Sequence, residues 1–467
     1  MKKIIIPGAL LMTLLSANPL AALAPNLPPL EAVNFKPPKG DRVALDNGLV
    51  VYLMKDNTLP VIHMTAFIRT GKLNDPADKI GLGEMTAGLL KDGGTLKYKS
   101  DEIDKKLEFL GAQVESSIGN EEARADLTTL KKDLDEVLDI YAQVLTSPAF
   151  EPAKVKIHRD ETLEMISRRN DDPARAAMRE AVRSFYGAGH PYGWRTETAT
   201  INAITIEDMK AYHANYYRPN NVILAVAGDF ASNEEMLGKL NKKFGAWQRG
   251  EVKFPVIPPV QLEGKRRVFH IEKDSQQAFI VMLQKGVKRL DPVEYPLTVT
   301  NEMLGGGLSS RLASEIRSRK GLAYSVYSYF AKKPDYGYIV GYVGTKPETY
   351  SQALTEMIRQ FDLLKAEAAP AEEVTRARDS IVNSFVFKFA TPFELISERA
   401  AYEYYGYAPD YLDNYVENIA KTDPAAVLET AKKLFKPGDA MLFVIGDSKK
   451  FDKPLSDFGP VTELTED

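Results

Sequence analysis

The sequence predicts an α+β protein made of two tandem, homologous domains, each a largely antiparallel sheet with helices packed on it. Three observations support this prediction: landmarks recur at a fixed offset, strand patterns come before amphipathic helices in each half, and a proline-rich segment separates the halves. The chain has 467 residues, 44% hydrophobic and 27% charged. That is globular composition, and the length exceeds one ordinary core.

The internal repeat is clearest near the end of each half. Residues 216–229 read YYRPNNVILAVAGD, and residues 434–447 read LFKPGDAMLFVIGD. Both have an aromatic-basic-Pro start, turn residues, an apolar strand and Gly-Asp, and the prolines and the glycines each match at an offset of 218. Glu84-Met85 and Glu302-Met303 share that offset. Several landmarks with one spacing indicate a tandem duplication.

The boundary between the halves is predicted at residues 248–264, where three prolines stand among polar residues. Such a segment favours an extended, exposed linker. It separates an N-terminal domain, residues 41–247, from a C-terminal domain, residues 265–448.

Local patterns predict the elements of the first half. Residues 42–69 alternate apolar and polar around an Asn-Gly turn, which is typical of a hairpin. Ser100 is suited to cap a helix that Gly111 ends. Residues 112–130 then read as two short strands. Residues 131–146 form an amphipathic helix pattern. Strands followed by helices in one unit favour an α+β domain.

The N-terminus predicts export. Residues 1–24 combine Lys2 and Lys3, an apolar run and small residues before a cleavage point, which is the pattern of a secretory signal peptide. No later run approaches the roughly 18 apolar residues of a membrane span. The chain has no cysteine, so disulfides, thiolate chemistry and a lipoprotein anchor are excluded. We therefore expect a periplasmic protein with its signal peptide removed.

Charge and histidine spacing exclude two further classes of function. The net charge is -4, and no basic stripe with interleaved aromatics appears, so nucleic-acid binding has no support. No two of the five histidines are three or four residues apart, so no helical turn presents two imidazoles to one ion.

Residues 81–95, GLGEMTAGLLKDGGT, resemble the segment of M16 (pitrilysin/insulinase, mitochondrial processing peptidase) metallopeptidases that carries the inverted zinc motif H-x-x-E-H. Aligned on the glycines, the first His falls at Glu84, the Glu at Ala87 and the second His at Gly88. The third ligand of the family falls at Met165. These positions offer one carboxylate, whereas catalytic zinc needs three protein ligands and a general base. The resemblance implies an M16B-like chain of LuxS/MPP-like metallohydrolase fold that binds no metal itself.

The second half of the chain contains the clearer candidates for substrate-binding residues. Residues 304–324 read LGGGLSSRLASEIRSRKGLAY. The glycines Gly305, Gly306 and Gly307 allow close backbone approach, either beside a substrate or in tight helix packing. Arg317 and Tyr324, on either side of a helix break, resemble the Arg/Tyr pair of M16 peptidases. A guanidinium and a phenol there would donate hydrogen bonds to peptide carbonyls and to a developing oxyanion.

The resemblance implies a substrate-binding subunit without catalytic residues of its own. A homologous zinc-bearing M16 subunit would complete a heterodimeric endopeptidase, with Arg317 and Tyr324 supplied in trans and an unfolded peptide as substrate. Zinc is expected in the partner only. One alternative is a stand-alone peptide-binding or scaffold protein of the same fold. Another is an enzyme with an unrecognised site, which would show as chelator-resistant turnover.

Overall fold

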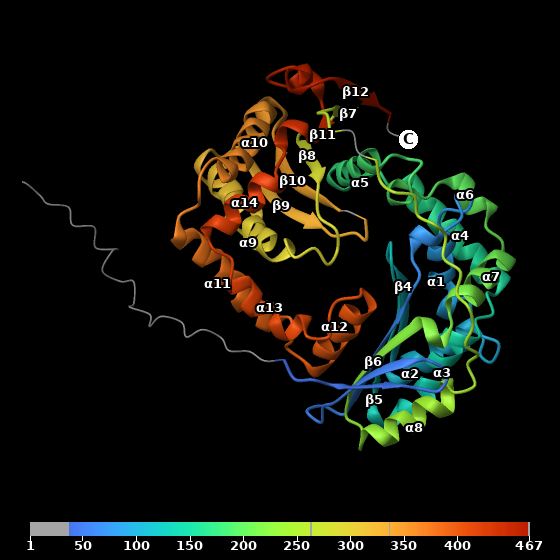
Figure 1. Cartoon of the computed structure of the whole chain (residues 1–467). Helices are drawn as coiled ribbons and strands as arrows, with labels where there is room; N and C mark the ends of the chain where they lie inside the picture. The colour runs from blue at the N-terminus through green and yellow to red at the C-terminus, as the bar shows by residue number, and fades with distance from the viewer. Residues whose placement is uncertain (1–36, 262–263, 336, 466–467) are drawn as a thin grey trace, which may run out of the picture. The chain divides into compact units, whose positions relative to one another are not determined.

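The computed structural model describes residues 37–261, 264–335 and 337–465. Within these residues the chain forms two six-stranded sheets with helices against them (Figure 1). The predicted α+β architecture with two largely antiparallel sheets is therefore confirmed. The signal peptide predicted at 1–24 lies outside the described residues, and the linker boundaries at 248 and 264 stay a prediction.

The first sheet has the strand order β1-β2-β6-β3-β5-β4. Neighbouring strands are antiparallel except for β2 and β6, which are parallel. Its strands are β1 (Asp41–Ala44), β2 (Val50–Lys55), β3 (Val61–Ile68), β4 (Gln113–Ile118), β5 (Ala123–Leu130) and β6 (Val222–Gly228).

The second sheet repeats this topology, with the order β12-β7-β11-β8-β10-β9. Again the pair next to the edge, β7 and β11, is parallel, but the edge strand β12 runs parallel to β7 whereas β1 runs antiparallel to β2. Its strands are β7 (Val268–Glu272), β8 (Ala278–Lys285), β9 (Ala323–Ala331), β10 (Tyr338–Thr345), β11 (Met441–Gly446) and β12 (Val461–Leu464). The matching strand orders give the sequence repeat a structural basis.

The helices follow the same division along the chain. Those before residue 250 are α1 (Leu82–Asp92), α2 (Ser100–Leu110), α3 (Leu134–Thr146), α4 (Pro152–Ser167), α5 (Pro173–Tyr186), α6 (Thr198–Ala203), α7 (Ile206–Tyr216) and α8 (Asn233–Phe244). Those after it are α9 (Glu294–Gly305), α10 (Tyr350–Ala366), α11 (Ala371–Phe387), α12 (Pro392–Tyr404), α13 (Tyr411–Ala420) and α14 (Pro424–Leu434). None of the helices in the described part of the chain is both long and apolar enough to cross a membrane.

Most of the locally predicted elements of the first half appear where expected, including the hairpin, the two strands at 112–130 and the end of α2 at Gly111, which has φ 59°. The predicted cap of α2 is wrong. Lys99 is the N-cap and Ser100 is the first helical residue. The carboxylate of Glu151, distant in sequence, instead accepts a hydrogen bond of 3.1 Å from the Ser100 backbone N–H. That tertiary contact satisfies the backbone N–H of the first helical residue, which has no partner within the helix.

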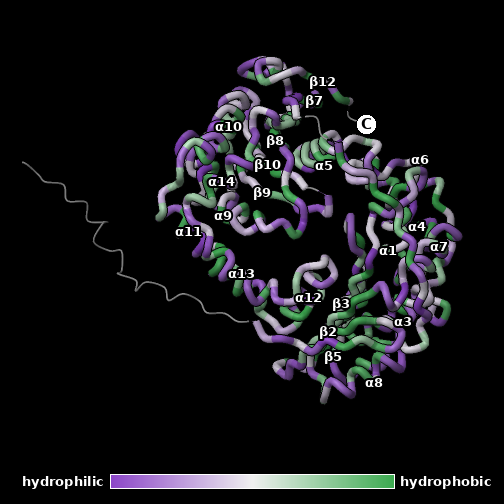
Figure 2. The backbone as a smooth tube through the Cα atoms, viewed as in Figure 1, coloured by the Kyte–Doolittle hydropathy of each residue, from purple (hydrophilic) through white to green (hydrophobic). Residues whose placement is uncertain are grey.

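Each sheet is covered on one face by a helix from the other half of the chain. Helix α5 packs on β8 and β11 of the second sheet, and α12 packs on β6, β2 and β3 of the first. Ala177 and Ala181 of α5, and Ile396 and Ala400 of α12, are fully buried in these contacts. Figure 2 shows hydrophobic segments at β2 and β3. In β6 and β11 every residue is buried. A strand apolar on both faces needs cover on both, and the exchanged helices provide the second layer.

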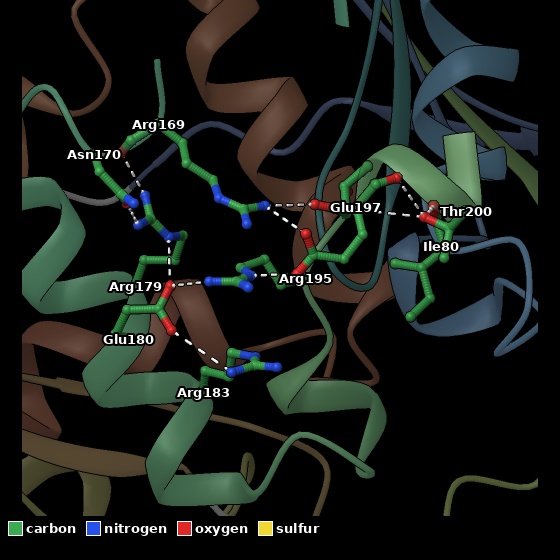
Figure 3. A network of polar contacts seen from close by, with 10 residues as sticks. Ile80, Arg169, Asn170, Arg179, Glu180, Arg183, Arg195, Glu197 and Thr200 are labelled. Carbon is green, nitrogen blue, oxygen red and sulfur yellow. Dashed lines mark hydrogen bonds and ion pairs between the residues drawn. The ribbon is translucent and has the colours of Figure 1, made fainter. Parts of the chain in front are cut away.

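Helix α5 is anchored by a buried acidic residue among arginines (Figure 3). Glu180 is only 5% exposed. Its carboxylate accepts hydrogen bonds of 2.9 Å from both Arg179 and Arg195, and Arg183 lies 3.8 Å away. Burial opposes ionisation, but the hydrogen bonds and charges of the arginines outweigh it and lower the pKa of Glu180. This carboxylate is therefore ionised near neutral pH.

The same cluster extends to the start of α1. Glu197 accepts a hydrogen bond of 2.6 Å from Arg195 and forms an ion pair of 2.9 Å with Arg169. In the following turn, Thr200 Oγ1 donates to the Ile80 carbonyl at 2.8 Å. The arginine cluster thus links the exchanged helix α5 to the residues that lead into α1.

Candidate functional site

Helix α1 carries the positions at which zinc ligands were expected to be missing. Its first turn is capped by the carboxylate of Asp75, which accepts hydrogen bonds of 2.8 Å from the backbone N–H groups of Gly81 and Gly83. Gly81 has φ +104°, a conformation that favours glycine. The apolar residues of the helix, such as Met85 and Leu89, are fully buried. Glu84 and Gly88, one turn apart, are left on the more open side of α1.

Glu84, at the position of the first zinc-ligating His, is held by a cation. Its Oε2 lies 3.0 Å from the ammonium of Lys72, and both side chains are partly exposed. Ala87, at the general-base position, is buried, and Ser116 Oγ donates to its carbonyl at 2.5 Å. Ala87 has no group that could take a proton from water, and the carboxylate of Glu84 is already paired with Lys72.

Gly88, at the second His position, lies against His158 of α4. A Cβ added to Gly88 would be 2.7 Å from His158 Cε1 and 2.9 Å from its Nε2. The imidazole therefore fills the space that a side chain at position 88 would need. Met165, at the third ligand position, is 61% exposed. The role of His158 was not predicted, because nothing in the local sequence shows that α4 brings it to α1.

The residues present do not fit a zinc ion. Glu84, Ala87, Gly88 and Met165 supply one carboxylate, which Lys72 already pairs. In the described ranges, no cluster of three or more His, Asp or Glu side chains is arranged to hold a metal ion. We therefore derive no hydrolytic step at this site.

Asp75 gives α1 a titratable cap. The side chain is 3% exposed, and burial raises its pKa to about 7, although the N–H donors of Gly81 and Gly83 act in the opposite direction. An unfolded Asp has a pKa of about 3.9. Between these two values the folded protein binds the proton and the unfolded chain does not, so stability falls as pH rises through the folded pKa.

The variant Asp75→Asn tests this titration. Because Asn does not ionise, we expect the wild type to lose about 2 kcal/mol of unfolding free energy relative to the variant between about pH 5 and about pH 8. Urea unfolding of both proteins at the two pH values measures the difference. Other titrating groups, such as the buried His213, are present in both proteins, so their contributions cancel in the difference between the two unfolding free energies. A difference independent of pH would show that Asp75 is ionised throughout.

Arg317 and Tyr324, predicted as a pair, lie in contact. Arg317 is on a π-helical turn, Ala313–Arg319, which is followed by Gly321 at φ +62°, and Tyr324 is near the start of β9. The guanidinium carbon lies 4.9 Å from the centroid of the Tyr324 ring, a cation–π contact. Tyr324 is 80% exposed. Among the described residues, Arg317 has no ion pair with a carboxylate, so its donors are available to a ligand.

The neighbouring arginines are engaged elsewhere, as expected of structural or surface charges. Arg311 makes two hydrogen bonds of 2.7 Å to Glu373, and Arg319 donates to Glu315 at 2.6 Å. No hydrogen bond, ion pair or ring contact in the described part of the chain joins Arg317 or Tyr324 to Glu84, Gly88 or Met165. The pair and the positions of the degenerate motif are therefore separate features of this chain.

The three glycines beside the pair differ in their surroundings. A Cβ on Gly305 would lie 2.3 Å from the Ser328 backbone nitrogen, and one on Gly306 would meet Glu302. A Cβ on Gly307 would meet nothing within 4 Å. The sequence left two roles open for these glycines, tight helix packing or close approach to a substrate. At Gly305 the structure shows tight packing of α9 against β9, whereas the space beside Gly307 is open and could admit a ligand.

Strand β9 forms one edge of the second sheet and carries Tyr324, Tyr327 and Tyr329. Tyr327 stacks on Tyr342 of β10 at 4.6 Å between ring centroids, and Tyr329 is half-buried beside Tyr338. Tyr336 lies outside the described residues. The tyrosines pack mainly on one another, and Tyr324 stands apart from them by its exposure.

Comparison with known proteins identifies the class. Residues 50–196 match the family described as Insulinase (Peptidase family M16), and residues 203–381 match the Peptidase M16 inactive domain. The chain belongs to the M16 peptidase family. It is similar to an uncharacterized zinc protease of Streptomyces coelicolor, with 26% identity over 373 residues that cover 78% of this chain and 80% of the relative.

Solved structures share the fold. A peptidase M16 inactive domain from Pseudomonas fluorescens superposes with a TM-score of 0.81 at 23% identity, covering 90% of this chain and 100% of that one. The periplasmic protease PqqL from Escherichia coli gives a TM-score of 0.74 at 17% identity. That match covers 90% of this chain and 49% of PqqL.

Proposed function

We propose that this chain is the non-catalytic, substrate-binding subunit of a zinc metalloendopeptidase whose zinc is bound by a homologous partner chain. One observation carries the proposal: Arg317 and Tyr324 lie together and accessible, whereas the motif positions Glu84 and Gly88 are taken up by Lys72 and His158. A division of labour between two chains accounts for both facts.

The pair is suited to hold a peptide at a partner's zinc. The ring of Tyr324 orients the guanidinium of Arg317 through the cation–π contact. The guanidinium fork and the phenol hydroxyl then donate hydrogen bonds to a carbonyl oxygen, and these strengthen as negative charge develops on it. The chemistry of water activation stays with the partner, where zinc lowers the pKa of bound water.

The proposed compartment is the periplasm. Its support is the secretory pattern of residues 1–24 and the fold shared with a protease described as periplasmic. Export would place the protein in a compartment where unfolded peptides are not reached by cytosolic proteases.

The test combines the purified chain with candidate zinc-bearing M16 homologues. We expect peptide hydrolysis by the mixture and none by this chain alone. Arg317→Ala and Tyr324→Phe are each expected to slow hydrolysis about tenfold, the effect of removing a charge-assisted or transition-state hydrogen bond. Arg319→Ala, two residues away and paired with Glu315, is the matched control and should leave the rate unchanged.

A second candidate function is stand-alone peptide binding, favoured by the open edge of β9 with its exposed Tyr324. An extended peptide can add to such an edge as a further strand. Saturable peptide binding by the pure chain, with no homologue that yields an active mixture, would favour this function over the first. Chelator-resistant turnover by the pure chain would contradict both.

A further inference from the structure

A pocket of about 530 Å³ lies at one end of the second sheet. The end of β8 and the starts of β7 and β11 lie together here. In the sheet register, Met441 of β11 is opposite Leu283 of β8, and Leu442 of β11 is opposite Val268 of β7. The end of α14 and Phe185 of α5, the helix beside β8 in Figure 1, complete the walls. This volume is within the range of small-molecule sites, about 300–1,000 Å³. We call it the cationic pocket.

Its charged lining is mostly positive. Two acidic residues, Asp291 and Asp439, face six cationic ones: Lys265, Arg267, Lys285, Lys288, Lys433 and Lys436. Lys288 pairs with Asp335 at 3.6 Å, and Lys436 Nζ donates to the Lys432 carbonyl at 2.7 Å. Within the described residues, Lys265 and Lys433 have neither a carboxylate nor a hydrogen-bond partner. An excess of positive charge around a concave surface attracts an anion.

One residue of the lining, Gln284, also holds a buried donor without a partner. Gln284 is 4% exposed, and its Oε1 accepts a hydrogen bond of 2.5 Å from the Lys436 backbone N–H. Its Nε2 is buried and has no hydrogen-bond partner in the structure. Leaving a buried donor unpaired costs about 1–3 kcal/mol.

The rest of the lining is apolar. Phe185, Leu283, Val287 and Met441 are all buried side chains that contribute to the walls. A ligand that covers them needs an aliphatic or aromatic body in addition to its charge.

An extended peptide is a poor occupant of this pocket. Strands β7, β8 and β11 each have a neighbouring strand on both sides. In the sheet, β7 lies between β12 and β11, β11 lies between β7 and β8, and β8 lies between β11 and β10. Their backbone groups are already paired, so the pocket offers no free strand edge for main-chain hydrogen bonds. The chemistry of the lining suits a ligand with one anionic head and few other polar atoms.

We propose that the cationic pocket binds an amphiphilic anion, with a carboxylate or phosphate head between Lys265 and Lys433 and an apolar body against Leu283 and Met441. This binding is independent of the peptidase role, because neither Arg317 nor Tyr324 lines the pocket. Decanoate and decyl phosphate represent the two sources of such a head, a free carboxylate and a phosphate.

Calorimetric titration of the purified chain tests the proposal. We expect one molecule of decanoate or decyl phosphate to bind per chain, and the tighter of the two identifies the head. Acetate, which lacks the body, and 1-decanol, which lacks the charge, should each bind at least about tenfold more weakly. Absence of saturable binding by both charged probes, or equal binding of 1-decanol, would overturn the proposal.

Two variants locate the binding site. Lys265→Glu with Lys433→Glu reverses two charges at the pocket, and Gln284→Glu adds a negative charge to a residue of the lining while it keeps the acceptor for the Lys436 backbone N–H. Each is expected to weaken binding about tenfold or more. Lys210→Glu with Lys242→Glu makes the same charge change on exposed residues of α7 and α8 and should leave affinity unchanged. Thermal unfolding establishes that each variant is folded. Folded pocket variants that bind as tightly as the wild type would place the ligand elsewhere and overturn the assignment.

Discussion

Replacing Glu180 with alanine is expected to lower the unfolding free energy by about 4 kcal/mol, the range found when one partner of a buried ion pair is removed. Glu180 is the carboxylate to which Arg179 and Arg195 donate inside the arginine cluster (Figure 3). The side chain of Arg195 is only 12% exposed and forms ion pairs with both Glu180 and Glu197. In the alanine variant it retains the ion pair with Glu197 alone. Like charges would then lie close together in a region of low dielectric.

Urea unfolding measures this effect as a lower midpoint. Glu372→Ala is the control, because Glu372 forms an exposed pair with Arg376 one helical turn away, and the expected change is below about 1 kcal/mol. The pKa of Glu180 is lowered in the folded state, so its contribution is present above the usual pKa of Glu and is lost as pH falls through the folded value. The two variants should therefore converge on acidification. Equal midpoints for them at neutral pH would show that the cluster is not a stabilising feature.

Replacing Gly305 with alanine is expected to cost about 3 kcal/mol of stability, at the upper end of the usual penalty for overpacking. The added Cβ would lie 2.3 Å from the Ser328 backbone nitrogen and 2.5 Å from its Oγ. Ser328 cannot retreat freely, because it pairs with Gly341 in the sheet. Helix α9 or strand β9 would have to move.

Gly307→Ala is the matched control two residues along the chain. No atom lies within 4 Å of its added Cβ, and the expected change in stability is below about 0.5 kcal/mol. Thermal or urea unfolding of the two variants gives the comparison. A neutral Gly305→Ala would contradict the close packing and return this glycine to a role beside the substrate.

Much of the fold could be predicted from the sequence because the signals are local. The Asn-Gly turn between β1 and β2 and the glycine that ends α2 act through the conformation of a few residues. The repeat of residues 216–229 at 434–447 predicted two similar units, and the two sheets have matching strand orders. The cap of α2 was wrong because Glu151, which supplies it, is distant in sequence.

The candidate site was predictable only in part. Arg317 and Tyr324 are seven residues apart, so a helix break between them is enough to bring them into contact. Position 88 is different. That His158 fills the space beside Gly88 depends on how α4 packs against α1, and no pattern in either helix records it. The cationic pocket likewise combines residues of α5, β8, α14 and β11 with the loops beside them, and it was not predicted.

The sequence by itself determined the class of fold, because periodicity and turns act locally along the chain, and it predicted that zinc ligands are missing at the positions aligned with the family motif. Only the tertiary structure decided that α5 and α12 each cover the sheet of the opposite half, that Lys72 pairs with Glu84, and that Gly305 packs against β9. These features depend on contacts between residues far apart in sequence, where the burial of apolar faces and the pairing of charges select one arrangement among many.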